Sequence, residues 1–278
     1  MNYSIRCLAA AAALASLSVV AQADVVVQAG SSYNDAYFSG STIDWDYSSL
    51  QVQGFNVLLL SSQAIAPASI NHVYEYDPDI EETVVSESRL TAPVTAIGVN
   101  GSSQITSLYI GGGVTWTLPR TAGIAQGGSF SITNLNIDLS NKRVYASITG
   151  NFTGAATGSA GTPGGAITTL NNFQLWNIST VAGNTTWPTF YGDMYAGIPG
   201  INASGLSLTE EGYNHLVSAL RLANLGKNVL TAVNNEGFGS IATPVPEASS
   251  VAMATSGMAL LAFLSRRRAR ASERHATA

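Results

Sequence analysis

Short runs of alternating apolar and polar residues recur along the middle of the chain, with Gly, Asn, Ser or Asp between them about every 8–12 residues. Alternation places every second side chain on the same face, which predicts half-buried β-strands. The clearest example is segment 131–150, SITNLNIDLSNKRVYASITG, in which two alternating runs flank the polar turn 140–143. We expect an antiparallel hairpin there, a second hairpin at 105–118 and a further strand at 168–180. The pattern predicts a mainly β fold, either a sandwich or a barrel, and we favour a β-sandwich-like domain of antiparallel hairpins over residues 24–233.

Segment 207–227, SLTEEGYNHLVSALRLANLGK, shows a helical period instead. Ser207 or Thr209 can cap its first turn, where Glu210 and Glu211 favour the positive end of the helix dipole. Gly226 is well placed to end the helix in a left-handed conformation. The apolar residues fall near one face: Tyr213, Leu216, Val217, Leu220 and Leu225. We therefore expect one C-terminal amphipathic helix that covers an open edge or end of the domain, followed by a linker at 234–244.

The first 23 residues have the three parts of a secretory signal peptide. Arg6 precedes an apolar run over 7–20, and the small residues Ala21 and Ala23 frame the expected cleavage site. The apolar run is shorter than the ~20 residues that a spanning helix needs. We expect signal peptidase to cut after Ala23, which makes Asp24 the first residue of the mature protein.

The opposite end of the chain predicts a membrane helix. Residues 249–265 contain no charged side chain, and as a helix they would be about 25 Å long. A basic cluster follows: Arg266, Arg267, Arg268 and Arg270. Arginines directly after a span are retained on the cytoplasmic side. This topology agrees with the signal peptide, because both place residues 24–233 outside the inner membrane.

The sequence Val245-Pro246-Glu247, the apolar segment and the arginine cluster together resemble the PEP-CTERM sorting signal of Gram-negative bacteria. The resemblance covers about 25 residues, 245–270, and leaves a short tail at 271–278. It implies recognition and cleavage by exosortase near Pro246 and Glu247, transfer to the cell surface or extracellular matrix, and an association with exopolysaccharide and biofilm. Ala248 stands where the family usually has a second proline, which leaves the position of the cut open. The alternative interpretation is a plain C-terminal anchor.

Charge and cysteine content narrow the function classes. Residues 24–243 hold 6 of the 12 Lys and Arg but 15 of the 17 Asp and Glu, a net charge of −9. Such a surface repels phosphate backbones, and we expect no nucleic-acid partner. The single cysteine, Cys7, lies in the signal peptide, so the mature protein has no disulfide.

Candidate chemical groups are few. His72 and His215 are the only histidines of the mature domain, which excludes a structural zinc site built from Cys and His. No Gly-x-Ser-x-Gly elbow marks a nucleophilic serine. Asp77, Asp79 and Glu81 resemble the start of a calcium loop, although the EF-hand pattern needs glycine where Glu82 stands. An acidic, exposed hairpin loop is the simpler interpretation. The glycine-rich composition of segment 154–165 predicts a flexible loop between strands.

These observations favour an exported, non-enzymatic protein without a cofactor or metal, with a structural or adhesive role at the surface. Its expected partners are the general secretion machinery with its signal peptidase, exosortase, and exopolysaccharide. A ligand-binding β-module for haem or calcium is one alternative, since the hairpin followed by GLSLTEEG (205–212) resembles the secreted haem-binding β-modules of bacterial haem uptake. A secreted hydrolase is the other alternative.

Overall fold

The protein is mainly β, as the alternating pattern predicts. The computed structural model describes residues 24–50, 60–78, 81–187, 195–196, 198 and 200–243. Its strands are β1 (Val25–Gln28), β2 (Ser31–Tyr33), β3 (Ala36–Phe38), β4 (Ser41–Asp46), β5 (Ser61–Ile65), β6 (Ser69–Asp77), β7 (Glu82–Val99), β8 (Ile105–Ile110), β9 (Gly113–Thr121), β10 (Ala125–Asp138), β11 (Arg143–Gly150), β12 (Thr168–Gly183), β13 (Tyr195–Ala196), β14 (Ile201–Leu208) and β15 (Ser240–Ala242). Its helices are the 3₁₀ helix η2 (Ala155–Thr157) and the α-helices α2 (Glu210–Ala219) and α3 (Asn224–Glu236).

Among the described strands, eight antiparallel strands close into a ring in the order β7, β4, β15, β14, β12, β11, β10, β8 and back to β7. We call this ring the barrel. The predicted antiparallel strands are confirmed, but the expected β-sandwich is wrong, because pairing of β8 with both β10 and β7 joins the two ends of the sheet. Closure is possible because β7 and β10 are long, with 18 and 14 residues, and each pairs with different strands along its two halves.

The hairpin expected at 131–150 is present as β10 and β11, but the hairpin expected at 105–118 is wrong. Its two strands, β8 and β9, do not pair with each other; they follow one another along the same edge of β10. Between them Gly112 has a φ of +79°, and a Cβ atom on Gly113 would lie 1.9 Å from the backbone oxygen of Ile132. These glycines therefore bend one long strand, and the bend directs β8 towards β7 to close the barrel.

Aromatic rings from separate strands meet in the core. The ring centroid of Trp45 in β4 lies 5.0 Å from that of Trp176 in β12 and 5.9 Å from that of Trp116 in β9. The indole N–H of Trp45 donates a 3.3 Å hydrogen bond to the backbone oxygen of Phe238. All four residues are fully buried or nearly so, and this ring packing joins the barrel wall to the segment that enters β15.

Two helices, not one, follow β14. Arg221 has a φ of +53°, which ends α2, and α3 starts at Asn224. Gly226, expected to end a single helix, lies inside α3, where a Cβ atom would be 2.4 Å from the backbone oxygen of Ile124. Both helices contribute buried side chains to the barrel core: Leu216, Val217, Leu220, Leu230 and Val233.

The segment predicted as a linker, 234–244, is mostly part of the folded domain. It contains the end of α3 and strand β15, which pairs with β14 on one side and β4 on the other. A three-residue strand has too little alternation to be recognised in a sequence, and here its two neighbours supply its structure. The compact unit ends at Thr243.

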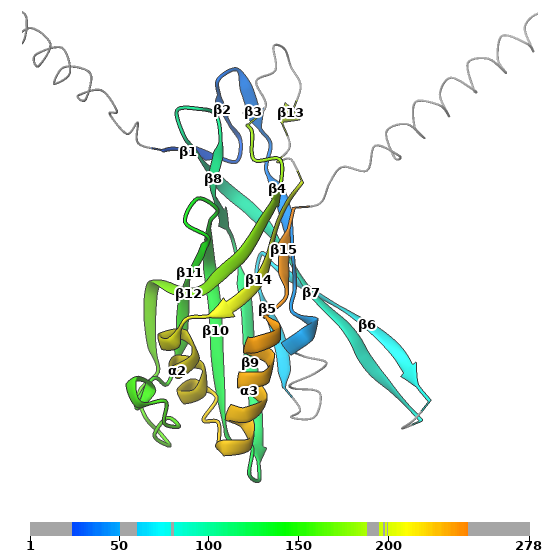
Figure 1. The fold of residues 1–278 in the computed structure, drawn as a ribbon, viewed down its shortest axis with the longest axis vertical. Helices are drawn as coiled ribbons and strands as arrows, with labels where there is room; N and C mark the ends of the chain where they lie inside the picture. Colours follow the sequence, from blue (N-terminus) through cyan, green and yellow to red (C-terminus); the bar gives the residue numbers. More distant parts are fainter. Residues whose placement is uncertain are drawn as a thin grey trace, which may run out of the picture. The chain divides into compact units, whose positions relative to one another are not determined.

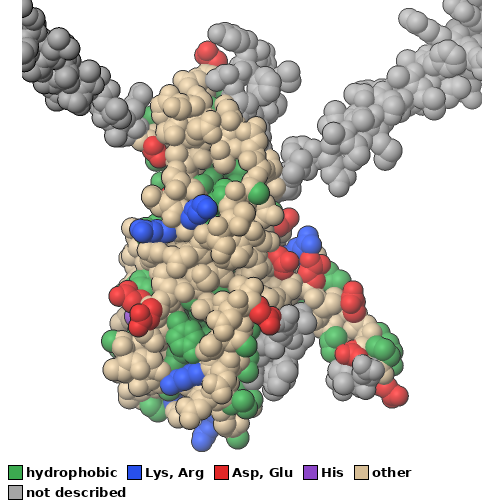
Figure 2. All heavy atoms as spheres, in the orientation of Figure 1, with side chains coloured by type: hydrophobic (Ala, Val, Ile, Leu, Met, Phe, Trp, Pro, Cys, Tyr) green, Lys and Arg blue, Asp and Glu red, His purple; other side chains and the backbone are tan. Residues whose placement is uncertain are grey.

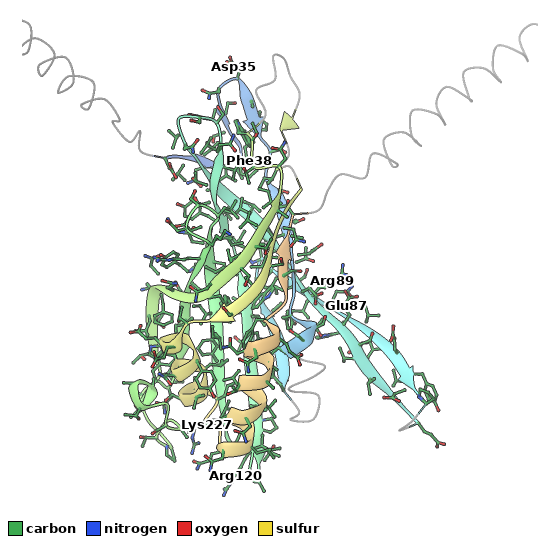
Figure 3. The ribbon with its side chains drawn as sticks, viewed as in Figure 1. Asp35, Phe38, Glu87, Arg89, Arg120 and Lys227 are labelled. Atoms are coloured by element: carbon green, nitrogen blue, oxygen red, sulfur yellow. The ribbon has the colours of Figure 1, made fainter. Side chains whose placement is uncertain are left out.

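Strands β6 and β7 form a two-stranded arm that extends away from the barrel (Figure 1). We define the arm as residues 69–89, from the start of β6 to the root of the outer half of β7. Residues 82–88 of β7 pair with β6 alone among the described strands. At the root of the arm Arg89 Nε donates a 2.5 Å hydrogen bond to the carboxylate of Glu87 (Figure 3).

The expected signal peptide and C-terminal helix lie outside the described residues, as do the residues expected at the processing sites, except Asp24. No helix in the described part of the chain is long and apolar enough to span a membrane.

Candidate functional site

A pocket of about 420 Å³ opens between the first turns of α2 and the glycine-rich loop that contains η2. Thr209 fixes the start of α2, because its hydroxyl accepts a 3.0 Å hydrogen bond from the backbone N–H of Gly212. This confirms one of the two caps expected from the sequence. The pocket is lined by Ala155, Ala156, Glu210, Glu211, Asn214 and His215.

His215 lies between two aromatic rings at the inner wall of this pocket. Its ring centroid is 4.6 Å from that of Phe152 and 5.0 Å from that of Phe173. Its Nδ1 atom is buried and has no hydrogen-bond partner among the described residues. Burial lowers the pKa of His215 below its usual value, and the carboxylate of Glu211 opposes this shift. The imidazole is therefore mainly neutral at pH 7, the form that accepts a hydrogen bond or binds a metal.

The loop that forms the opposite wall is held against α2. The backbone N–H of Gly161 donates a 3.0 Å hydrogen bond to the backbone oxygen of Ser218, whose hydroxyl donates to the backbone oxygen of Thr153 at 2.7 Å. A Cβ atom on Gly158 would lie 2.8 Å from Oδ1 of Asn214. The segment expected to be a flexible loop is therefore packed closely on the helix, and its glycines permit that approach.

The pocket combines two carboxylates, an amide and a neutral imidazole with the methyl groups of Ala155 and Ala156. Such a set of groups can bind a small hydroxyl-rich or cationic molecule, and His215 with Glu211 could contribute two ligands to a metal. The sequence indicates His215 as a candidate, but it gives no signal for Phe152 and Phe173. Their proximity depends on β11 and β12 meeting α2, and no local signal reports it.

The acidic segment expected to be an exposed hairpin loop is the tip of the arm. Asp77 ends β6, Glu81 lies in the turn with a φ of +55°, and Asp79 lies outside the described residues. Among the residues that the structure describes, no three His, Cys, Asp or Glu side chains gather closely enough to hold a metal ion. The exposed-hairpin interpretation is confirmed for the described part of this segment.

His72 lies near the base of the arm in contact with a serine. Its Nδ1 atom is 2.9 Å from the hydroxyl of Ser88, and the backbone N–H of Ser88 donates to the hydroxyl of Ser48. Ser48 in turn donates a 2.5 Å hydrogen bond to Asp46. In a catalytic triad the acid orients the histidine and the serine is accessible. Here the acid contacts another serine and Ser88 is 0% exposed, so the network fastens the arm to β4.

Of the residues expected at the two processing sites, only Asp24 is described. It is exposed, and its carboxylate accepts a 2.5 Å hydrogen bond from the hydroxyl of Thr106 at the start of β8. Outside the described residues lie Ala21, Ala23, Val245, Pro246, Glu247, Arg266, Arg267, Arg268 and Arg270.

No family model and no curated protein matches this chain. A crystal structure of the heme binding protein HtaB from Corynebacterium glutamicum is similar at a TM-score of 0.37 and 12% sequence identity, over 80% of this chain and 94% of that chain. A similarity at this level carries no argument about function.

Proposed function

We propose that this chain is an exported, non-enzymatic protein whose barrel domain is delivered to the cell surface or extracellular matrix of a Gram-negative bacterium. A signal peptide would direct export, and the sorting signal at 245–270 would hold the chain in the inner membrane until exosortase cuts it. At the surface the domain would act as a structural or adhesive component associated with exopolysaccharide.

The observation that carries this proposal is the fit between the folded domain and the two expected cuts. Strand β1 starts at Val25, one residue after the first cut, and pairs with β7. Strand β15 ends at Ala242, shortly before Pro246. A cut at each site would release a domain with every described strand intact, whereas a cut a few residues further inside at either end would damage β1 or β15, the strand that joins β14 to β4.

The surface composition also supports an extracytoplasmic location. Only 10% of the residues are charged, and the strands and loops are rich in Ser, Thr and Asn. Hydroxyl and amide groups keep such a surface soluble through hydrogen bonds, which can also be made to the hydroxyls of a polysaccharide.

Mass spectrometry of the protein recovered from the cell envelope and from the medium tests the proposal. We expect an N-terminus at Asp24 and a C-terminus close to Glu247. In a Glu247→Gln variant we expect residues 249–278 to remain attached, whereas Glu236→Gln, at the end of α3, should be processed normally. Recovery of the full chain from the cytosol, with residues 1–23 still present, would contradict the proposal.

A second candidate function, a ligand-binding β-module for haem or calcium, is favoured by the pocket at His215. An imidazole such as that of His215 is a common axial ligand of haem iron, and carboxylates such as those of Glu210 and Glu211 bind calcium together with water, since no three metal-binding side chains of the described residues gather closely enough to hold an ion alone. The buried core of the described residues runs from Val27 to Ile241, so the domain 24–243 contains it completely.

Titration of this domain with haemin and with Ca²⁺ tests the second candidate. Haem binding at the pocket would shift the Soret band, and His215→Ala would remove the shift while His72→Ala would leave it unchanged. Calcium binding would raise the melting temperature of the domain. Absence of both effects would reject this function.

A further inference from the structure

One face of the arm displays two tyrosines to solvent. Tyr74 and Tyr76 are 60% and 65% exposed, the largest values among the exposed aromatic side chains of the described residues. Since they are two residues apart in β6, both project from the same face. His72 belongs to this face too, with its ring centroid 6.2 Å from that of Tyr74. The cross-strand partners Val85 and Thr83 complete the surface.

This surface is too small to hold a protein partner stably. Two aromatic side chains of about 150–250 Å² each, exposed to this extent, offer roughly 200–300 Å². A stable protein interface buries about 800 Å² on each partner. The backbone instead advances about 7 Å from Tyr74 to Tyr76, so the two rings can stack on separate units of one extended chain molecule.

The negative charge of the arm limits which class of chain molecule can bind to the two tyrosines. Residues 69–89 contain six Asp and Glu but only one basic residue, Arg89, whose guanidinium is paired with Glu87. Figure 2 shows acidic side chains beside apolar ones along the arm. Such a field repels nucleic acids, anionic lipid surfaces and acidic polysaccharides. A neutral chain with apolar C–H faces and many hydroxyls suits both the rings and the carboxylates, which accept hydrogen bonds from hydroxyls.

We propose that the Tyr74 and Tyr76 face of the arm binds a neutral polysaccharide by stacking on its sugar rings. This inference rests on the surface location proposed above and assigns the polysaccharide contact to a defined site. The arm is suited to this role because it extends from the barrel and is held at its root by the 2.9 Å hydrogen bond from the backbone N–H of Ser88 to the hydroxyl of Ser48 (Figure 1).

Affinity electrophoresis in native gels tests this site. The probes are three neutral polymers, hydroxyethylcellulose, laminarin and dextran, with alginate as the acidic polymer. The samples are the full chain in mild detergent and the domain 24–243. We expect at least one neutral polymer to retard both samples and alginate to retard neither. Tyr74→Ala/Tyr76→Ala should weaken retardation at least about tenfold.

The matched control is Val73→Ala, which removes a 39% exposed side chain from the opposite face of the same strand and should leave retardation unchanged. Circular dichroism should show the same melting temperature for both variants, because the substituted side chains are exposed. The inference is overturned if no neutral polymer retards the wild-type protein, if the double variant is retarded equally, or if sedimentation shows that the tyrosines mediate a dimer instead. If the tyrosines cause retardation but the protein is never exported, only the proposed function is contradicted. If the protein is exported and processed correctly but is not retarded, only this inference is contradicted.

Discussion

Nε of Arg221 donates a 3.2 Å hydrogen bond to the backbone oxygen of Gly161, across 60 residues of sequence. The same guanidinium donates from Nη2 to the side-chain oxygen of Gln126 at 2.7 Å. Arg221 therefore joins the end of α2 to the glycine-rich loop and to the start of β10. It does so from a left-handed backbone conformation, with a φ of +53°, which is unfavourable for a residue with a side chain.

We expect Arg221→Ala to lower the free energy of unfolding by about 2 kcal/mol, because several hydrogen bonds to a charged group are lost. Arg221→Gly loses the same bonds but relieves the backbone strain, so it should be less destabilising than the alanine variant. Urea unfolding measures both. Arg120→Ala, which removes an exposed arginine at the far end of β9, is the control and should change stability by less than about 0.5 kcal/mol (Figure 3).

Gly113 is required where β8 bends into β9. A Cβ atom there would lie 1.9 Å from the backbone oxygen of Ile132, which is held between β9 and β11 and cannot move away. We expect Gly113→Ala to destabilise the protein by about 3 kcal/mol or more, or to prevent folding. Gly123→Ala meets no atom within 4 Å and is strained only by its φ of +76°, so it should cost about 1–2 kcal/mol. Equal stability of the two variants would contradict the role of Gly113 in the bend.

The parts of the fold that could be predicted are those decided by local pattern. Ile137 and Val144 alternate with polar neighbours on either side of a polar turn, so the β10–β11 hairpin follows from the sequence. Thr209 before two glutamates identifies the start of α2 in the same way. In both cases the residues that determine the element are close together along the chain.

The remaining features depend on partners that are distant in sequence. Barrel closure requires β8 to pair with β7 as well as with β10. The three glycines between β8 and β9 are compatible with a hairpin turn and with a bend in one strand, so the sequence does not predict which of the two forms. The break at Arg221 interrupts a sequence with a continuous helical period, because the loop and β10 supply hydrogen bonds that outweigh the strain. The candidate pocket depends on contacts of Phe152 and Phe173 with His215. The three residues come from separate segments, so the periodicity of the sequence does not predict these contacts.

Thr209 has two roles at the pocket. Its hydroxyl accepts from the N–H of Gly212 and donates a 3.0 Å hydrogen bond to the backbone oxygen of Gln174, so it ties the start of α2 to β12. We expect Thr209→Ala to lower the free energy of unfolding by about 1–2 kcal/mol, whereas Thr209→Ser should retain most of it. Guanidinium unfolding of the two variants makes the comparison. If serine and alanine were equally destabilising, the methyl group rather than the hydroxyl would be responsible.

The pH dependence of stability should identify His215. Burial lowers its pKa in the folded protein, while in the unfolded chain the pKa is close to the ordinary value of about 6.5. Between these two pKa values the unfolded chain binds more protons than the folded one, so stability falls as the pH drops through about 6.5. The loss is complete only below the folded-state pKa.

The groups that face the imidazole of His215 are consistent with this direction. Two phenylalanine rings disfavour the charged form, and the carboxylate of Glu211 favours it only in part. We expect the melting temperature of the wild-type protein to fall more steeply between pH 7.5 and pH 5.5 than that of His215→Gln. If the melting temperature of His215→Gln fell as steeply as that of the wild-type protein, His215 would not cause the pH dependence. Its lowered pKa would then no longer support a neutral imidazole in the pocket.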